Sequence, residues 1–171
     1  MAGISESSYR ACRRAFIAAC EARHVESVAR VHPARDRNGR PLFMDCAALG
    51  PRLAIRAVLA IASDAAGSAI AVALLEKGLA LPEDGRLVLV HALDPAAFAG
   101  VKIDAAWPGD MLKAVGREDL SRVRDLAVLP LARELGNIEP ALAAPQASIR
   151  ALPTVGGLAE AEAAIAGFFG G

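Results

Sequence analysis

Two apolar runs on either side of a helix-length segment constrain the fold of this chain more than any other feature. Residues 56–62 (RAVLAIA) and 87–93 (LVLVHAL) are the near-continuous apolar stretches expected of strands buried on both faces. Residues 67–77 are apolar and long enough for a helix, Gly78 can end it, and residues 82–85 (PEDG) predict a turn. Strand, helix and strand in this order predict a βαβ unit with a right-handed crossover.

The remaining segments add helices and a hairpin to this centre. The turn signal at residues 36–39 (DRNG) lies between extended runs at 25–32 and 42–47, which predicts a β-hairpin. Helical spacing of apolar residues predicts helices over 5–22, 118–135 and 158–169, with Pro130 kinking the second, and a short helical segment over 139–144. Residues 94–116 read as irregular. We therefore expect one α/β domain: a mixed sheet with a parallel βαβ centre, an antiparallel hairpin at one edge, and helices on both faces.

Charge and cysteine content narrow the classes of function. The 19 basic and 19 acidic residues cancel, so charge gives no argument for binding nucleic acid or an anionic membrane. Three cysteines without a CxxC spacing argue against a disulfide framework or a cysteine zinc site, and we interpret them as buried free thiols. The first residues lack the hydrophobic region of a signal peptide, and the longest apolar run is too short to span a bilayer, so a cytoplasmic protein is expected.

Several polar residues are candidates for a site at the end of the predicted strands. Asp64, Ser68, His91 and Asp94 could converge at one sheet edge, where open α/β sheets place their sites. A Ser-His-Asp triad is one interpretation, although the chain has no GxSxG elbow; a core histidine hydrogen-bonded to a backbone carbonyl is the other for His91. Gly67 and Ser68 at a helix start could bind an anion, or Ser68 could simply cap the helix.

Other polar and aromatic residues give weaker signals. His24 and His32 are expected on the surface, and with Asp36 they could form a metal site that has no recognised spacing. Trp107, in the stretch read as irregular, could anchor an interface or cover the core.

Residues 40–99 resemble the N-terminal half of the DUF2817 family, relatives of the M14-like zinc carboxypeptidases. In that family a strand ends in a zinc-binding His-Gly-x-Glu loop followed by Gly-Ser and a helix; here residues 63–68 read SDAAGS. Residues 91–99 (HALDPAAFA) are similar to the family's His-Ala-x-Asn-Pro-x-Gly-Phe-Ala stretch. Residues 8–51 are similar to the family's opening helix and hairpin. Residues 132–157 are similar to a degenerate form of a later region of the family.

The departures from the family pattern bear directly on function. Asp64 is the one potential zinc ligand left in the shortened loop, whereas a catalytic zinc typically has three protein ligands. Lys102 is the only basic residue near the position where such peptidases hold the substrate carboxylate. The family's third zinc ligand and general-base Glu would lie beyond Gly171. The resemblance thus implies half of a peptidase fold without its catalytic groups.

These observations favour a non-catalytic binding or assembly module that holds neither zinc nor another cofactor. Its expected partner is a second copy of itself or a full-length relative. The alternative is a residual hydrolase that uses Asp64, His91 and Asp94, with metal or residues supplied by a partner subunit. A third hypothesis is a small-anion-binding protein that uses Gly67 and Ser68, with Lys102 as a further ligand-binding candidate.

Overall fold

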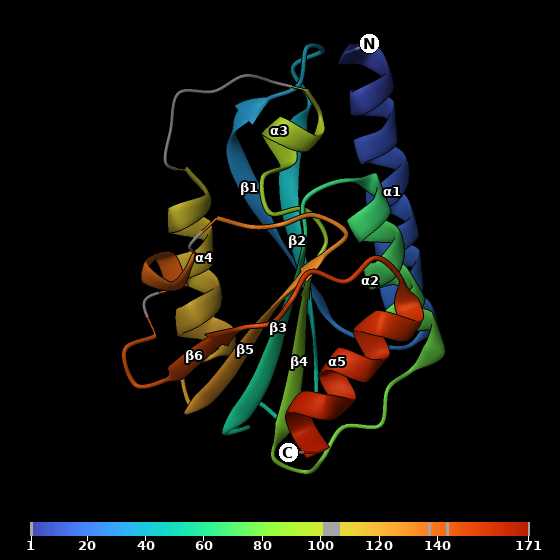
Figure 1. The fold of residues 1–171 in the computed structure, drawn as a ribbon. Helices are drawn as coiled ribbons and strands as arrows, with labels where there is room; N and C mark the ends of the chain where they lie inside the picture. The colour runs from blue at the N-terminus through green and yellow to red at the C-terminus, as the bar shows by residue number, and fades with distance from the viewer. Residues whose placement is uncertain (1, 101–106, 137, 143, 171) are drawn as a thin grey trace.

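The computed structural model describes residues 2–100, 107–136, 138–142 and 144–170. Three consecutive strands follow the first helix, and helices then separate the remaining strands (Figure 1). In chain order they are α1 (Ala2–Ala22), β1 (Ser27–Arg35), β2 (Pro41–Leu49), β3 (Arg56–Ala62), α2 (Ala65–Lys77), β4 (Gly85–Val90), α3 (Pro95–Phe98), α4 (Trp107–Asp119), β5 (Asp125–Leu131), the 3-10 helix η1 (Glu139–Leu142), β6 (Ser148–Ala151) and α5 (Leu158–Gly170).

The strands form a six-stranded mixed sheet in the order β1-β2-β4-β3-β5-β6. β3 pairs in parallel with β4 on one side and with β5 on the other, so the predicted βαβ unit is confirmed as β3-α2-β4. The predicted hairpin is β1-β2, which joins the sheet through antiparallel pairing of β2 with β4. The fold is therefore α/β with an antiparallel hairpin at one edge, as the sequence predicts.

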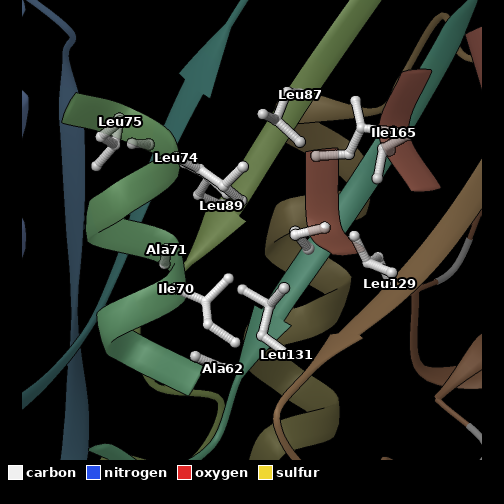
Figure 2. Packing of buried hydrophobic residues seen from close by; sticks show 14 of the residues in the cluster. Ala62, Ile70, Ala71, Leu74, Leu75, Leu87, Leu89, Leu129, Leu131 and Ile165 are labelled. Atoms are coloured by element: carbon white, nitrogen blue, oxygen red, sulfur yellow. The ribbon is translucent and has the colours of Figure 1, made fainter. Parts of the chain in front are cut away.

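Helices cover both faces of the sheet, and successive residues of the central strands β3, β4 and β5 belong to two different cores. α1, α2 and α5 lie on one face and α4 on the other (Figure 1). On the first face, Val58, Ala60 and Ala62 of β3 pack with Leu74 of α2 and Ile165 of α5; Figure 2 shows part of this cluster. The intervening residues of β3 contact the second cluster, with Leu112 and Val115 of α4. Both faces of the strand are thus buried, which explains its unbroken apolar sequence.

The helix predicted over residues 118–135 is wrong. α4 ends at Asp119, and the following apolar run forms the buried strand β5. Pro130, predicted to kink a helix, instead lies in this strand opposite Ile61 of β3. Its missing N–H therefore interrupts no helix. Residues 126–131 are as continuously apolar as β3, and this pattern describes the segment better than helical spacing does.

Two further elements differ from the sequence expectation. Residues 94–116, read as irregular, contain α3 and most of α4. The edge strand β6 was not predicted, since its four residues are mostly exposed and carry no apolar run. The short helical segment predicted near residue 139 is confirmed as η1, and the terminal helices are confirmed as α1 and α5. Within the described ranges, no helix combines the length and hydropathy needed to cross a bilayer.

Candidate functional site

A pocket of about 320 Å³ lies where the parallel strands end at their carboxyl termini. Ser63 and Asp64 follow β3, Phe98 belongs to α3 just after β4, and Arg133 follows β5. Ser8 of α1 and two alanines complete the lining. Open α/β sheets bind ligands in this location because the loops after the strands converge there. The pocket is therefore the candidate functional site.

The loop between β3 and α2 is organised around Asp64. This residue caps α2, and its carboxylate accepts a hydrogen bond from the Gly67 N–H at 2.8 Å. A side chain at Gly67 would lie 2.5 Å from the Leu131 carbonyl oxygen, so the glycine lets the start of α2 approach β5 closely. Beside it, the buried Ser63 Oγ has no hydrogen-bond partner among the described residues.

Ser68 and His91 form a buried hydrogen-bonded pair behind this loop. Ser68 Oγ lies 2.9 Å from His91 Nδ1, and the two residues are 1% and 0% exposed. The His91 ring packs among Tyr9, Phe16 and Phe98, and its Nε2 has no described partner. Burial, with a smaller contribution from the positive charge of Arg13, lowers the pKa of His91 to about 3. The imidazole is therefore neutral at physiological pH.

The backbone at His91 connects this pair to a buried ion pair that the sequence analysis missed. The His91 N–H donates to the backbone carbonyl of Asp45 at 3.0 Å. The Asp45 side chain is fully buried and accepts from Arg13 Nε at 2.8 Å and Nη2 at 3.1 Å. Burial raises the pKa of the Asp45 carboxyl, and the hydrogen bond from Arg13 opposes that rise. The sequence signal for this ion pair is an acidic residue, Asp45, inside the apolar stretch LFMDCAAL.

Asp94 also acts as a helix cap. Its carboxylate accepts from the N–H groups of Ala96 and Ala97 at 3.1 and 3.2 Å, which begins α3. His32 Nε2 lies 3.5 Å from the same carboxylate. His32 is 2% exposed, so its predicted surface position is wrong: α3 packs against β1, the strand that carries this ring. Burial lowers the pKa of His32, and the charge of Asp94 partly offsets this effect.

The predicted candidates therefore meet only in part. Ser68 and His91 contact each other, whereas Asp64 and Asp94 each cap a helix, and within the described chain no carboxylate is hydrogen-bonded to the His91 ring. The Gly67 and Ser68 N–H groups, which an anion would need, donate to the side chain and backbone of Asp64. Lys102 lies outside the described residues. Trp107 begins α4, and its side chain is not described.

The residues at the loop after β3 do not fit a zinc ion. Asp64 is the one carboxylate in this loop, and it is engaged by the start of α2. Over the ranges that the structure describes, no three His, Cys, Asp or Glu side chains are grouped closely enough to hold a metal, and this includes the His24, His32 and Asp36 set. The three cysteines are free; Cys20 and Cys46 are buried and Cys12 is half-buried.

Comparison with solved structures gives distant similarities. The chain is similar to a glutaminyl cyclase from Fimbriiglobus ruber (14% identity, TM-score 0.45, 70% of this chain and 52% of that one). It is also similar to an aspartoacylase family protein from Mesorhizobium loti (15%, 0.39, 68% and 47%) and to a Porphyromonas gingivalis glutaminyl cyclase (13%, 0.44, 94% and 71%). The chain thus spans about half the length of the first two proteins.

Comparison with protein families gives a more direct assignment. No curated protein matches the chain. The model of the family DUF2817, described as a protein of unknown function, matches residues 6–102, which is more than half of the chain and runs from α1 to just beyond α3. This chain belongs to the DUF2817 family.

Proposed function

We propose that this chain is a non-catalytic, zinc-independent binding module, derived from the N-terminal half of an M14-like carboxypeptidase fold. The observation that carries the proposal is the role of Asp64 as the cap of helix α2. The loop after β3 offers this one carboxylate, and the hydrogen bond from the Gly67 N–H commits it to capping α2. A catalytic zinc site takes three protein ligands and an open position, and the described residues supply no such group.

The pocket at the carboxyl ends of the strands is the proposed ligand face. The buried hydroxyl of Ser63 has no hydrogen-bond partner among the residues that the structure describes, and an unsatisfied buried group of this kind favours a polar ligand or an ordered water. Arg133 is exposed on the rim and adds a positive charge, while Phe98 supplies an apolar wall. A small polar molecule that carries an anionic group and an apolar part matches this lining.

Thermal-shift measurements with amino acids and short peptides test the ligand face. A compound that stabilises the wild-type protein should stabilise Arg133→Ala less, because the rim charge is gone. Arg14→Ala, which changes an exposed arginine on α1 away from this pocket, is the matched control. An equal shift in all three proteins would place binding elsewhere and contradict this assignment of the pocket.

A second copy of the chain is the proposed partner, and a full-length relative is the alternative. The support is β1, an edge strand on which Val28 and Val31 are 42% and 63% exposed. An exposed edge with apolar side chains tends to pair with another strand. Sedimentation should therefore detect a dimer that Val31→Lys weakens and that Leu53→Lys, which changes an exposed loop residue, leaves intact. A wild-type monomer would remove the second-copy proposal.

One contact favours a residual hydrolase as the competing function. Ser68 Oγ and His91 Nδ1 are at hydrogen-bond distance, as a nucleophile and its base would be. Burial opposes this role, because neither side chain reaches the pocket surface in the described structure. This function would need a conformational opening that exposes Ser68.

Metal analysis and a hydrolysis screen separate the two functions. We expect no stoichiometric zinc after purification and no ester or peptide turnover that responds to zinc or to a chelator. If turnover is found, Ser68→Ala should abolish it and Ser63→Ala should preserve it under the hydrolase hypothesis. Such a result, or tightly bound zinc with chelator-sensitive activity, would overturn the proposal of a non-catalytic module.

A further inference from the structure

A second cavity lies at the opposite end of β4, remote from the pocket described above. It has a volume of about 200 Å³, enough for several water molecules or a small organic molecule. Its polar lining comes from Glu26 before β1, Arg52 after β2, Arg86 at the start of β4 and Asp119 at the end of α4. Val28 and Cys46 contribute apolar surface. Four elements distant in sequence thus converge on one space.

Arg86 is the unusual member of this lining. Its side chain is only 7% exposed, and Nη1 donates to the Gly50 carbonyl at 3.0 Å. Nη2 lies 3.4 Å from Asp119 Oδ1, which is long for a charge-assisted hydrogen bond. The buried Nε has no hydrogen-bond partner in the described chain. Buried polar groups are nearly always satisfied, so the Nε–H indicates a hydrogen-bond partner that the described residues do not supply.

The geometry of this guanidinium indicates which group would satisfy it. Nε–H and one Nη–H of arginine point the same way and together bind the two oxygens of a carboxylate. The Gly50 carbonyl binds Nη1 of Arg86. The opposite edge, formed by Nε and Nη2 and here called the Nε edge, has one long contact, from Nη2 to Asp119. Asp119 is also drawn toward Arg30, whose Nη2 lies 3.7 Å from Asp119 Oδ2. An incoming carboxylate therefore competes with a weak, shared contact.

The charges around the cavity select a ligand of low charge. Arg52 and Arg86 contribute two positive charges, and Glu26 and Asp119 contribute two negative ones. A multiply charged anion such as phosphate would be repelled by the two carboxylates, whereas a single carboxylate can approach the arginine edge. We propose that this cavity binds a small organic monocarboxylate through the Nε edge of Arg86, with Arg52 at the rim and the apolar part of the ligand against Val28.

Amide chemical shifts of the ¹⁵N-labelled protein, titrated with sodium propionate, test the proposal. We expect saturable shifts at Ala48, Gly50 and Arg86, and equal concentrations of sodium chloride or inorganic phosphate should not reproduce them. Arg86→Lys keeps the charge and loses the planar edge, so affinity should fall roughly tenfold or more. Arg52→Ala should weaken binding by a smaller factor, and Arg37→Ala, which changes an exposed arginine of the β1-β2 turn, should leave it unchanged.

Each outcome decides the proposal. Absence of saturable shifts at these amides in the wild-type protein would mean that water alone fills the cavity. Equal shifts with chloride would show a general salt effect, and tighter binding of phosphate would contradict the monocarboxylate assignment. Should Arg86→Lys fail to fold, the wild-type shift map together with the Arg52→Ala and Arg37→Ala affinities still tests the site. Equal affinity in these two variants would overturn it.

Discussion

Replacing Arg13 by methionine tests how the buried Asp45 is tolerated beneath α1. The substitution removes the guanidinium that donates two hydrogen bonds to the Asp45 carboxylate, at 2.8 and 3.1 Å. Breaking a buried ion pair by removing one partner costs about 3–5 kcal/mol. Because the Arg13 side chain is 26% exposed while that of Asp45 is fully buried, water screens this pair in part. We expect a loss of about 3 kcal/mol in the free energy of unfolding near neutral pH.

The loss of stability should depend on pH in a defined direction. Burial already raises the pKa of Asp45 in the wild-type protein, and the hydrogen bond from Arg13 limits the rise, so removing Arg13 raises this pKa further. An acid whose pKa is higher in the folded than in the unfolded state stabilises the fold at low pH, and this contribution is lost as pH rises through the folded pKa. The cost of Arg13→Met should therefore be largest near pH 7 and smaller near pH 5.

Urea unfolding followed by circular dichroism, at both pH values, measures these costs. The control is Arg14→Met, which changes the neighbouring exposed arginine of α1 and should alter stability by no more than about 0.5 kcal/mol. A cost for Arg13→Met below about 1 kcal/mol at neutral pH would show that the pair behaves as a surface salt bridge. An equal cost at both pH values would refute the role assigned to the Asp45 charge.

Three further predictions follow from buried groups. His91, whose pKa is lowered to about 3 by burial, should show no imidazole titration by NMR near its ordinary value of 6.5. Its contribution to stability should decline as pH falls below 6.5 toward 3, because the unfolded state then binds the extra proton. A titration midpoint near 6.5 in the folded protein would contradict the buried, neutral ring. Gly67→Ala should destabilise by about 1–3 kcal/mol in urea unfolding, since its Cβ meets a backbone oxygen at 2.5 Å, while Gly157→Ala, which meets nothing within 4 Å, should be nearly neutral; equal effects would argue against the close approach of α2 to β5. Burial raises the pKa of Cys46 to about 12, so mass spectrometry should find that iodoacetamide modifies half-buried Cys12 well before Cys46; the reverse order would mean that the sheet opens there.

The sequence predicts the centre of the fold better than its periphery. The bounds of β3 were predicted residue for residue because a strand buried on both faces is apolar throughout. The same signal was present at β5, where the helical spacing of Leu120, Val123 and Leu126 competed with it. Parallel pairing with β3 decides between the two, and no local pattern reports such long-range pairing. Edge strand β6 has almost no apolar pattern because little of it is buried.

The candidate site shows the same division between local and long-range information. The capping role of Asp64 can be anticipated from its place before a helix, and the depth of Ser68 and His91 cannot, because α1 and α3 cover them from elsewhere in the chain. The Arg13–Asp45 and Arg86–Asp119 pairs join residues 32 and 33 positions apart. Such pairs follow from the order of the strands, which the sequence alone did not determine beyond the βαβ unit.

The two sides of β3 carry side chains of different bulk. Val58, Ala60 and Ala62 lie toward α2, and Ala57, Leu59 and Ile61 lie toward α4. A slip of one residue along the neighbouring strands would push leucine and isoleucine into the narrow space beneath α2 and leave voids under α4, so misaligned pairings are penalised twice. By the same reasoning, enlarging Ala60 should be tolerated far less well than exchanging Leu59 for another aliphatic residue of equal volume. The alanine-rich composition of this chain thereby fixes the alignment of its central strand.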